Sequence, residues 1–148
     1  MTTPTARRPF HPVATSAAAY GLLATAHRGL AEAAATTVPA ERYAAAHLAA
    51  LRAAAAVLAA RARPAGIRSR PRSVWVLLPE VAPELAEWAT FFAAGAGKRA
   101  AAEAGLARWI STRDADDLLR DAETFLAVVE TTLRLPHQPA LPLASRAG

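Results

Sequence analysis

The sequence predicts an all-α protein, arranged as an antiparallel four-helix bundle whose third helix is interrupted. Apolar residues recur at helical spacing in four long segments, and breaks containing proline or glycine separate these segments. The stretch "SVWVLLPEV" has the propensity of a strand, but no second strand with turn residues exists to pair with it. With 148 residues, of which 53% are hydrophobic, the chain is long enough to form one domain with its own core.

The first two predicted helices are separated by "TTVPA". The first covers about residues 15–35, and Thr15 or Ser16 can cap it. The second starts at Pro39 or Ala40, because proline suits the first turn of a helix, and it runs to about residue 62. The residues expected on the core face of the first helix are Tyr20, Leu23, His27 and Leu30. The residues expected on the core face of the second are Tyr43, His47, Ala50, Leu51, Ala54, Val57 and Leu58.

The third predicted segment is divided by proline and glycine. Ser73 can cap a short helix that begins with "VWVLL", and prolines then separate it from a longer piece over residues 83–105. We expect Gly95 and Gly97 to bend that longer piece and Gly105 to end it. The residues expected on its bulky face are Leu85, Trp88, Phe91 and Phe92. The three tryptophans of the chain, expected in the core or at a dimer contact, are Trp75, Trp88 and Trp109.

The closing helix has the clearest amphipathic pattern. It begins near "STRD", where Ser111 and Asp114 have the spacing of a capping box, and it ends near Arg134, just before Pro136. The residues expected on its core face are Leu118, Ala122, Phe125, Leu126, Val129 and Leu133. Residues 1–12 and 136–148 contain prolines and lack periodicity, so we expect flexible tails on either side of a bundle over residues 13–135.

Composition narrows the function classes. The absence of cysteine excludes disulfides, a thiolate nucleophile and a cysteine-based zinc site. The chain shows no signal-peptide pattern and no uninterrupted apolar run of membrane-spanning length, so we expect a cytoplasmic protein with no membrane partner. The net charge of +5 permits an acidic partner or a nucleic acid, although frequent alanine and arginine are also typical of a genome rich in G and C.

The most basic stretch of the chain lies between the second and third predicted helices. Its arginines are Arg61, Arg63, Arg68, Arg70 and Arg72. They can contact the phosphates of RNA or of a nucleotide, or they can form a solvated loop, and both interpretations remain open. The stretch contains no aromatic residue on which single-stranded bases could stack. No cofactor and no metal site is expected, because no two histidines share a helix face with carboxylates.

The order of these segments resembles the HEPN superfamily of small helical bundles. The resemblance rests on "AHLAALRAAAAVLAARARP" (46–64), on "SVWVLLPEV" and on "DADDLLRDAETFLAVVETTL" (114–133), and it covers about residues 15–135. The chain is also similar to an uncharacterised actinobacterial HEPN subfamily. This resemblance implies a homodimer. It also implies either a metal-independent ribonuclease with Arg and His four to six residues apart, or a module that binds RNA, a nucleotide or a nucleotidyltransferase-type partner protein, as in some toxin–antitoxin systems.

Arg42 and His47 in "RYAAAH" have the Arg-x4-His spacing. A histidine can accept the 2′-hydroxyl proton of RNA, and an arginine can hold the scissile phosphate. In catalytic HEPN proteins, however, the motif lies near the closing helix, and this pair lies in the second. His47 also falls on the predicted core face, where a buried imidazole can bond to a neighbouring helix, while Arg42 points well away from that face.

These observations favour a non-catalytic HEPN-like binding or accessory module. The first alternative is an endoribonuclease that uses Arg42 and His47, and the second is an interaction protein with no role in nucleic-acid binding.

Overall fold

The computed structural model describes residues 12–61 and 72–134, and these residues form helices and short connections, with no strand among them. The long helices are α1 (Pro12–Ala35), α2 (Pro39–Arg61) and α6 (Thr112–Arg134). The short helices are α3 (Val74–Val81), α4 (Ala86–Ala94), α5 (Ala96–Glu103) and the 3₁₀-helices η1 (Pro83–Leu85) and η2 (Ala107–Trp109). The predicted all-α class is confirmed. The predicted tails at 1–12 and 136–148 lie outside the described residues, apart from Pro12, with which α1 begins.

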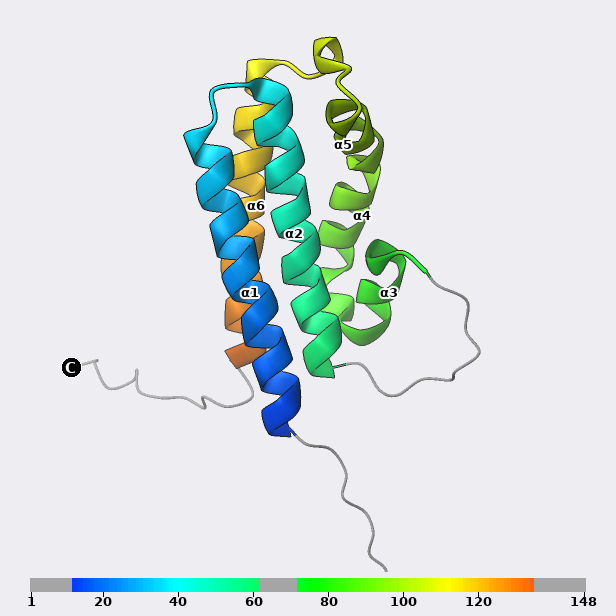
Figure 1. The fold of residues 1–148 in the computed structure, drawn as a ribbon. Coiled ribbons are helices and arrows are strands. Elements are labelled where there is room, and N and C mark those ends of the chain that lie inside the picture. Colours follow the sequence, from blue (N-terminus) through cyan, green and yellow to red (C-terminus); the bar gives the residue numbers. More distant parts are fainter. Residues whose placement is uncertain (1–11, 62–71, 135–148) are drawn as a thin grey trace, which may run out of the picture.

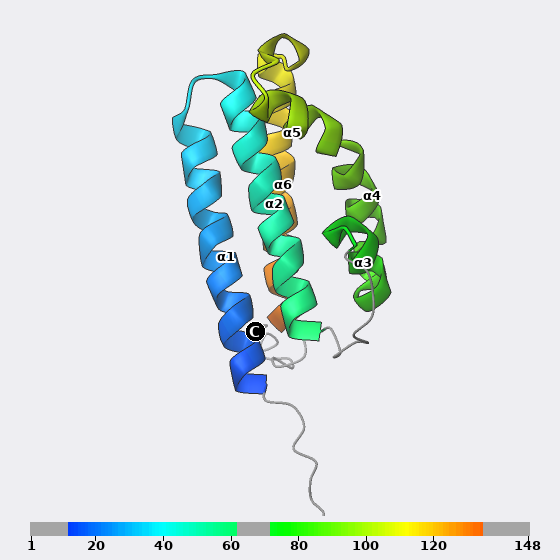
Figure 2. The same ribbon diagram turned by 45° about the vertical axis from the view of Figure 1, so that its right-hand side comes forward.

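The long elements run in alternating directions (Figure 1). α1 and the consecutive helices α4 and α5 point one way, and α2 and α6 point the other way, so the arrangement is antiparallel. The interrupted third element predicted from the sequence is therefore α3, η1, α4 and α5 in succession. α2 is central, because it packs against α1, α6, α3 and α5 (Figures 1 and 2).

Small side chains allow α2 to occupy this central position. Ala46, Ala50 and Ala53 are fully buried, so the neighbouring helices approach the backbone of α2 closely. α2 is long and apolar enough to cross a membrane, but half of its apolar window is buried inside the bundle. Burial of that kind is typical of a core helix whose apolar faces are covered by its neighbours.

Large aromatic side chains join α3 and α4 to α6. The Phe92 ring lies 5.2 Å from Trp75 and 5.1 Å from Phe125, and the Trp88 ring lies 5.3 Å from Phe125. Phe92 and Phe125 are fully buried. Trp75 and Trp88 thus belong to the core, which is one of the two positions expected for the tryptophans. Trp109 in η2, by contrast, is 60% exposed.

The prediction for the inner face of α1 is partly wrong. Tyr20 is 68% exposed and His27 is also exposed, although both were expected to face the core. The helix also starts at Pro12, before the two predicted capping residues. The hydrophobic residues that α1 buries are Ala19, Leu23, Ala26, Leu30 and Ala33.

Two predicted helix caps are confirmed. The Ser73 hydroxyl accepts a hydrogen bond from the backbone N–H of Trp75, at 3.0 Å, at the start of α3. Before α6, the Ser111 hydroxyl accepts from the Asp114 N–H, and the Asp114 carboxylate accepts from the Ser111 N–H, at 2.9 and 3.2 Å. This reciprocal pair is the capping box that the spacing predicted, and it satisfies two backbone donors that the helix leaves open.

The break between α4 and α5 lies at Gly95. A Cβ atom at this position would lie 2.9 Å from the Tyr43 hydroxyl oxygen and 3.5 Å from the His47 ring. The close approach of this turn to α2 therefore favours a residue without a side chain. The predicted bend in the third segment falls at this glycine.

We expect Gly95→Ala to destabilise the protein by about 1 kcal/mol, although alanine has the higher helix propensity. The control is Gly21→Ala in α1, where a Cβ meets nothing within 4 Å, and this change is expected to stabilise the protein by about 0.5–1 kcal/mol. Tyr43→Phe removes the contacting oxygen and should restore part of the stability in a double variant. Urea unfolding of the wild type, the two single glycine variants and the double variant measures these effects. Equal effects of the two glycine changes would contradict the contact.

Candidate functional site

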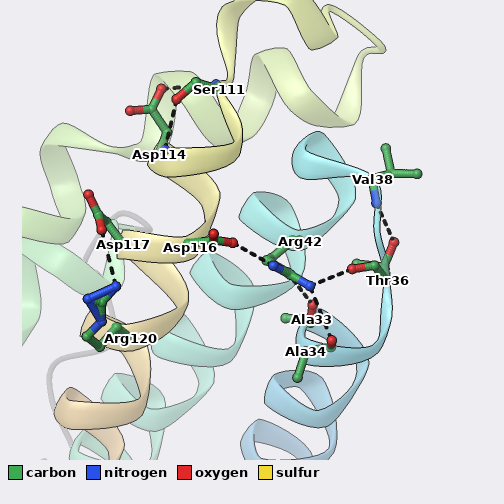
Figure 3. A network of polar contacts seen from close by, with 10 residues as sticks. All are labelled: Ala33, Ala34, Thr36, Val38, Arg42, Ser111, Asp114, Asp116, Asp117 and Arg120. Atoms are coloured by element: carbon green, nitrogen blue, oxygen red, sulfur yellow. Dashed lines mark hydrogen bonds and ion pairs between the residues drawn. The ribbon is translucent and has the colours of Figure 1, made fainter.

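The Arg42 guanidinium caps the C-terminal end of α1 (Figure 3). Its Nε–H donates to the Ala33 carbonyl at 2.9 Å. Its Nη2 donates to the carbonyls of Ala34 and Thr36 at 3.2 and 2.7 Å. Its Nη1 donates to the Asp116 carboxylate on α6. Arg42 therefore ties α1, α2 and α6 together at one end of the bundle.

The local sequence explains why Arg42 takes this position. The last carbonyls of a helix have no partner within the helix, and the negative end of its dipole attracts a cation. Residues 36–38 connect α1 to α2 so tightly that the first turn of α2 lies beside those carbonyls. An arginine in the first turn of a helix is unfavourable for that helix's own dipole, and this feature of the sequence could have indicated a side chain that folds back. Four of its five N–H donors are thus engaged, which leaves one for a ligand.

His47 is enclosed between α2 and the junction of α4 with α5. Its side chain is 1% exposed, and its Nε2 lies 2.8 Å from the Phe92 carbonyl oxygen. A carbonyl only accepts hydrogen bonds, so the proton of the neutral ring is on Nε2. Nδ1 then carries a lone pair, and it has no hydrogen-bond partner among the described residues. The ring is stacked near Tyr43 and contacts Trp75 edge-on.

Burial lowers the pKa of His47 below its ordinary value of 6.5. The bond to the Phe92 carbonyl and the charge of Glu103 raise the pKa, and the charge of Arg99 lowers it, but burial has the largest effect. The imidazole is therefore neutral at pH 7. The same burial removes it from contact with any substrate hydroxyl, which a general base must reach within hydrogen-bond distance.

The structure directs the two members of the Arg-x4-His pair to different neighbours of α2. Arg42 bonds to α1 and α6, whereas His47 bonds to α4. Both side chains make contacts that stabilise the helix ends, and no hydrogen bond joins one to the other in the described part of the chain. The sequence reasoning anticipated a buried histidine bonded to a neighbouring helix, but it did not identify the partner.

The ends of the basic stretch are anchored by carboxylates. Arg61 donates to the Glu84 carboxylate at 2.9 Å and to the Val81 carbonyl at 3.2 Å. Arg72 donates two hydrogen bonds to the carboxylate of Glu80, at 3.0 and 3.2 Å. The other three predicted arginines, Arg63, Arg68 and Arg70, lie outside the described residues.

The positive charge of the chain is concentrated outside the described residues. All 12 acidic residues lie in the described segments, together with 11 of the 17 basic ones, so these segments carry a formal charge of −1. The remaining basic residues are Arg7, Arg8, Arg63, Arg68, Arg70 and Arg146, and they account for the net charge of +5. The segments that carry them precede α1, join α2 to α3 and follow α6. The start of α1, the end of α2 and the end of α6 lie at the same end of the bundle (Figures 1 and 2).

Comparison with known protein families places most of the chain in one family model. The family model described as SAV_6107-like HEPN matches residues 33–130. The matched range runs from the end of α1 through most of α6, and it includes the capping network of Arg42, the buried His47 and the basic stretch. No curated protein and no solved structure matches the chain.

Proposed function

Because the chain belongs to the SAV_6107-like HEPN family, we propose that it is a non-catalytic member that binds RNA through the arginine stretch of residues 61–72. The observation that carries this proposal is the distribution of charge. The described helices are close to neutral, and the excess arginines lie in the segments that precede α1, join α2 to α3 and follow α6.

The contacts of Arg42 and His47 support the absence of catalysis. A ribonuclease of this kind needs a base that reaches the 2′-hydroxyl and an arginine that reaches the phosphate. Burial prevents the His47 ring from reaching a 2′-hydroxyl. The hydrogen bonds that cap α1 occupy most N–H donors of Arg42. Arg42 and His47 each make stabilising contacts within the bundle, and these contacts explain the residue without a substrate.

The arginine stretch supports a polyanionic partner. Arginine binds phosphate through two parallel N–H groups, and several arginines close together bind a phosphate backbone with little regard to base sequence. Since the stretch lacks aromatic residues, we expect contacts with phosphate rather than base stacking. Two of its five arginines already pair with Glu80 and Glu84, so the expected contribution comes mainly from Arg63, Arg68 and Arg70.

The expected result is salt-dependent binding to a fluorescein-labelled RNA hairpin and to a single strand of equal length, measured by anisotropy between 50 and 300 mM salt. Replacing Arg63, Arg68 and Arg70 by glutamine should weaken binding and reduce the slope of log K against log salt by about 0.7–0.9 for each phosphate that is no longer neutralised. The matched control replaces three exposed bundle arginines, Arg28, Arg113 and Arg120, by glutamine, which makes the same change in net charge.

The control separates a local site from overall charge. Weaker binding confined to the variant in the stretch supports the proposal. Equal weakening in both triple variants would contradict it, and so would an absence of binding at 50 mM salt, which would favour an interaction protein with no role in nucleic-acid binding.

The homodimer, the nucleotidyltransferase-type partner and the cytoplasmic location stay predictions. Light scattering at micromolar concentration tests the first, and a monomer mass would contradict it. Co-purification with the product of a neighbouring nucleotidyltransferase gene tests the second.

A further inference from the structure

A shallow cleft of about 310 Å³ lies between α4 and α6. The side chains that line it are Glu87, Trp88, Phe91 and Asp121. Three of them come from consecutive turns of α4, and the fourth comes from α6. The cleft combines two aromatic rings, of which that of Trp88 also packs against the core, with two carboxylates.

The aromatic rings of the cleft pack against the buried core. The Trp88 ring stacks on the fully buried Phe92, with centroids 6.0 Å apart and ring planes inclined by 16°. Phe91 meets Trp88 edge-to-face at 6.5 Å and also contacts Phe92 at 5.0 Å. Phe91 nevertheless remains 45% exposed. The rings therefore present a fixed aromatic surface to a ligand.

The carboxylates of the cleft differ from most others on α6 in their ion pairing. Neither Glu87 nor Asp121 forms an ion pair with any residue in the described ranges, although most other carboxylates of α6 do. Partial burial raises the pKa of Asp121, the nearby Asp117 raises it further, and Arg120 lowers it. A cation placed beside Asp121 would relieve this unfavourable environment.

We propose that this cleft receives an arginine side chain from a partner protein. A guanidinium is planar, stacks on aromatic rings and donates to carboxylates through a rigid fork, so one side chain satisfies both features of the cleft. A lysine fits less well because its ammonium group is a point charge that does not stack. RNA is disfavoured here because the two carboxylates of the cleft repel phosphate. The inference does not depend on the proposed function, since it rests on other residues.

The test uses the full-length ¹⁵N-labelled protein and a capped Gly-Arg-Gly peptide. The three tryptophan indole N–H signals are assigned with Trp75→Phe, Trp88→Phe and Trp109→Phe. We expect the Trp88 signal to move progressively with peptide concentration while the signal of the exposed Trp109 stays in place. The same peptide with citrulline, the neutral isostere of arginine, should produce less than about one fifth of the shift at equal concentration, because the charge provides most of the attraction.

Two variants complete the test. Asp121→Asn should weaken arginine-peptide binding about fivefold, and Phe91→Ala should weaken it by a similar factor. The matched control is Glu123→Gln, which removes an exposed carboxylate of α6 outside the cleft and should leave binding unchanged. Equal shifts with arginine and citrulline, equal movement of Trp109, or unchanged binding by Asp121→Asn would each overturn the proposal. Movement of the Trp88 signal on dilution of the protein alone would also overturn it, since a second copy would then occupy the cleft.

Discussion

Replacement of His47 by alanine is expected to lower the free energy of unfolding by about 3 kcal/mol. The change removes a fully enclosed ring from among Tyr43, Trp75 and Phe92, and the surrounding helices cannot close the cavity completely. It also removes the donor to the Phe92 carbonyl at the break between α4 and α5. Urea unfolding followed by far-ultraviolet circular dichroism measures the change. The control is His27→Ala, which removes an exposed histidine paired with Glu130 and should have an effect of less than about 1 kcal/mol.

The protonation state of His47 provides a second measurement on the same residue. Because burial lowers the pKa of His47, the unfolded chain binds a proton more readily than the folded protein does. The contribution of His47 to stability is therefore complete above pH 6.5, and it decreases as the pH falls from 6.5 toward the lower pKa of the folded state. The slope should not exceed about 1.4 kcal/mol per pH unit. His47→Leu, which fills the site but does not titrate, should lack this part of the pH dependence, and an unchanged slope would contradict the buried neutral ring.

Replacement of Arg42 by alanine is expected to destabilise the protein by about 2–3 kcal/mol. Three carbonyls at the end of α1 lose their donor, and Asp116 on α6 loses its cation. Arg42→Lys should recover less than half of this stability, because one ammonium group cannot reproduce the planar fork that reaches several acceptors.

Two controls identify which of these contacts matters. Asp116→Asn removes only the ion pair, and since Asp116 is partly exposed we expect an effect of less than about 1 kcal/mol. Arg113→Ala removes an arginine that is 86% exposed and should change stability by no more than about 0.5 kcal/mol. If Arg42→Ala left stability unchanged and reduced RNA affinity, Arg42 would be a ligand-binding residue and the capping role would be wrong.

The sequence predicted the closing helix well and the first helix poorly. In α6 the buried positions Leu118, Phe125 and Leu126 are large and their neighbours are charged, so the buried face is visible in the pattern. In α1 several buried positions are alanines, while Tyr20 is exposed. When small residues form the interface, side-chain size no longer marks the buried face. The rotation of the helix about its own axis then depends on contacts with the neighbouring helices.

The candidate site was predictable only in part. The helical wheel placed His47 inside, and the structure agrees, because its neighbours along α2 are apolar on that side. Its partner, the Phe92 carbonyl, could not be predicted, since it depends on how Gly95 brings the third element against α2. The network of Arg42 with α1 and Asp116 likewise depends on the tight connection at residues 36–38 and on a contact between segments far apart in the sequence.

The measurement that tests the proposed absence of catalysis most directly is incubation of the purified protein with single-stranded and hairpin RNA in the presence of EDTA. We expect the RNA to remain full length over hours, under conditions in which anisotropy detects a salt-sensitive complex. RNA cleavage by the wild-type protein that disappears in Arg42→Lys and His47→Leu, both with their helical circular dichroism signal retained, would show instead that these two residues form a catalytic pair.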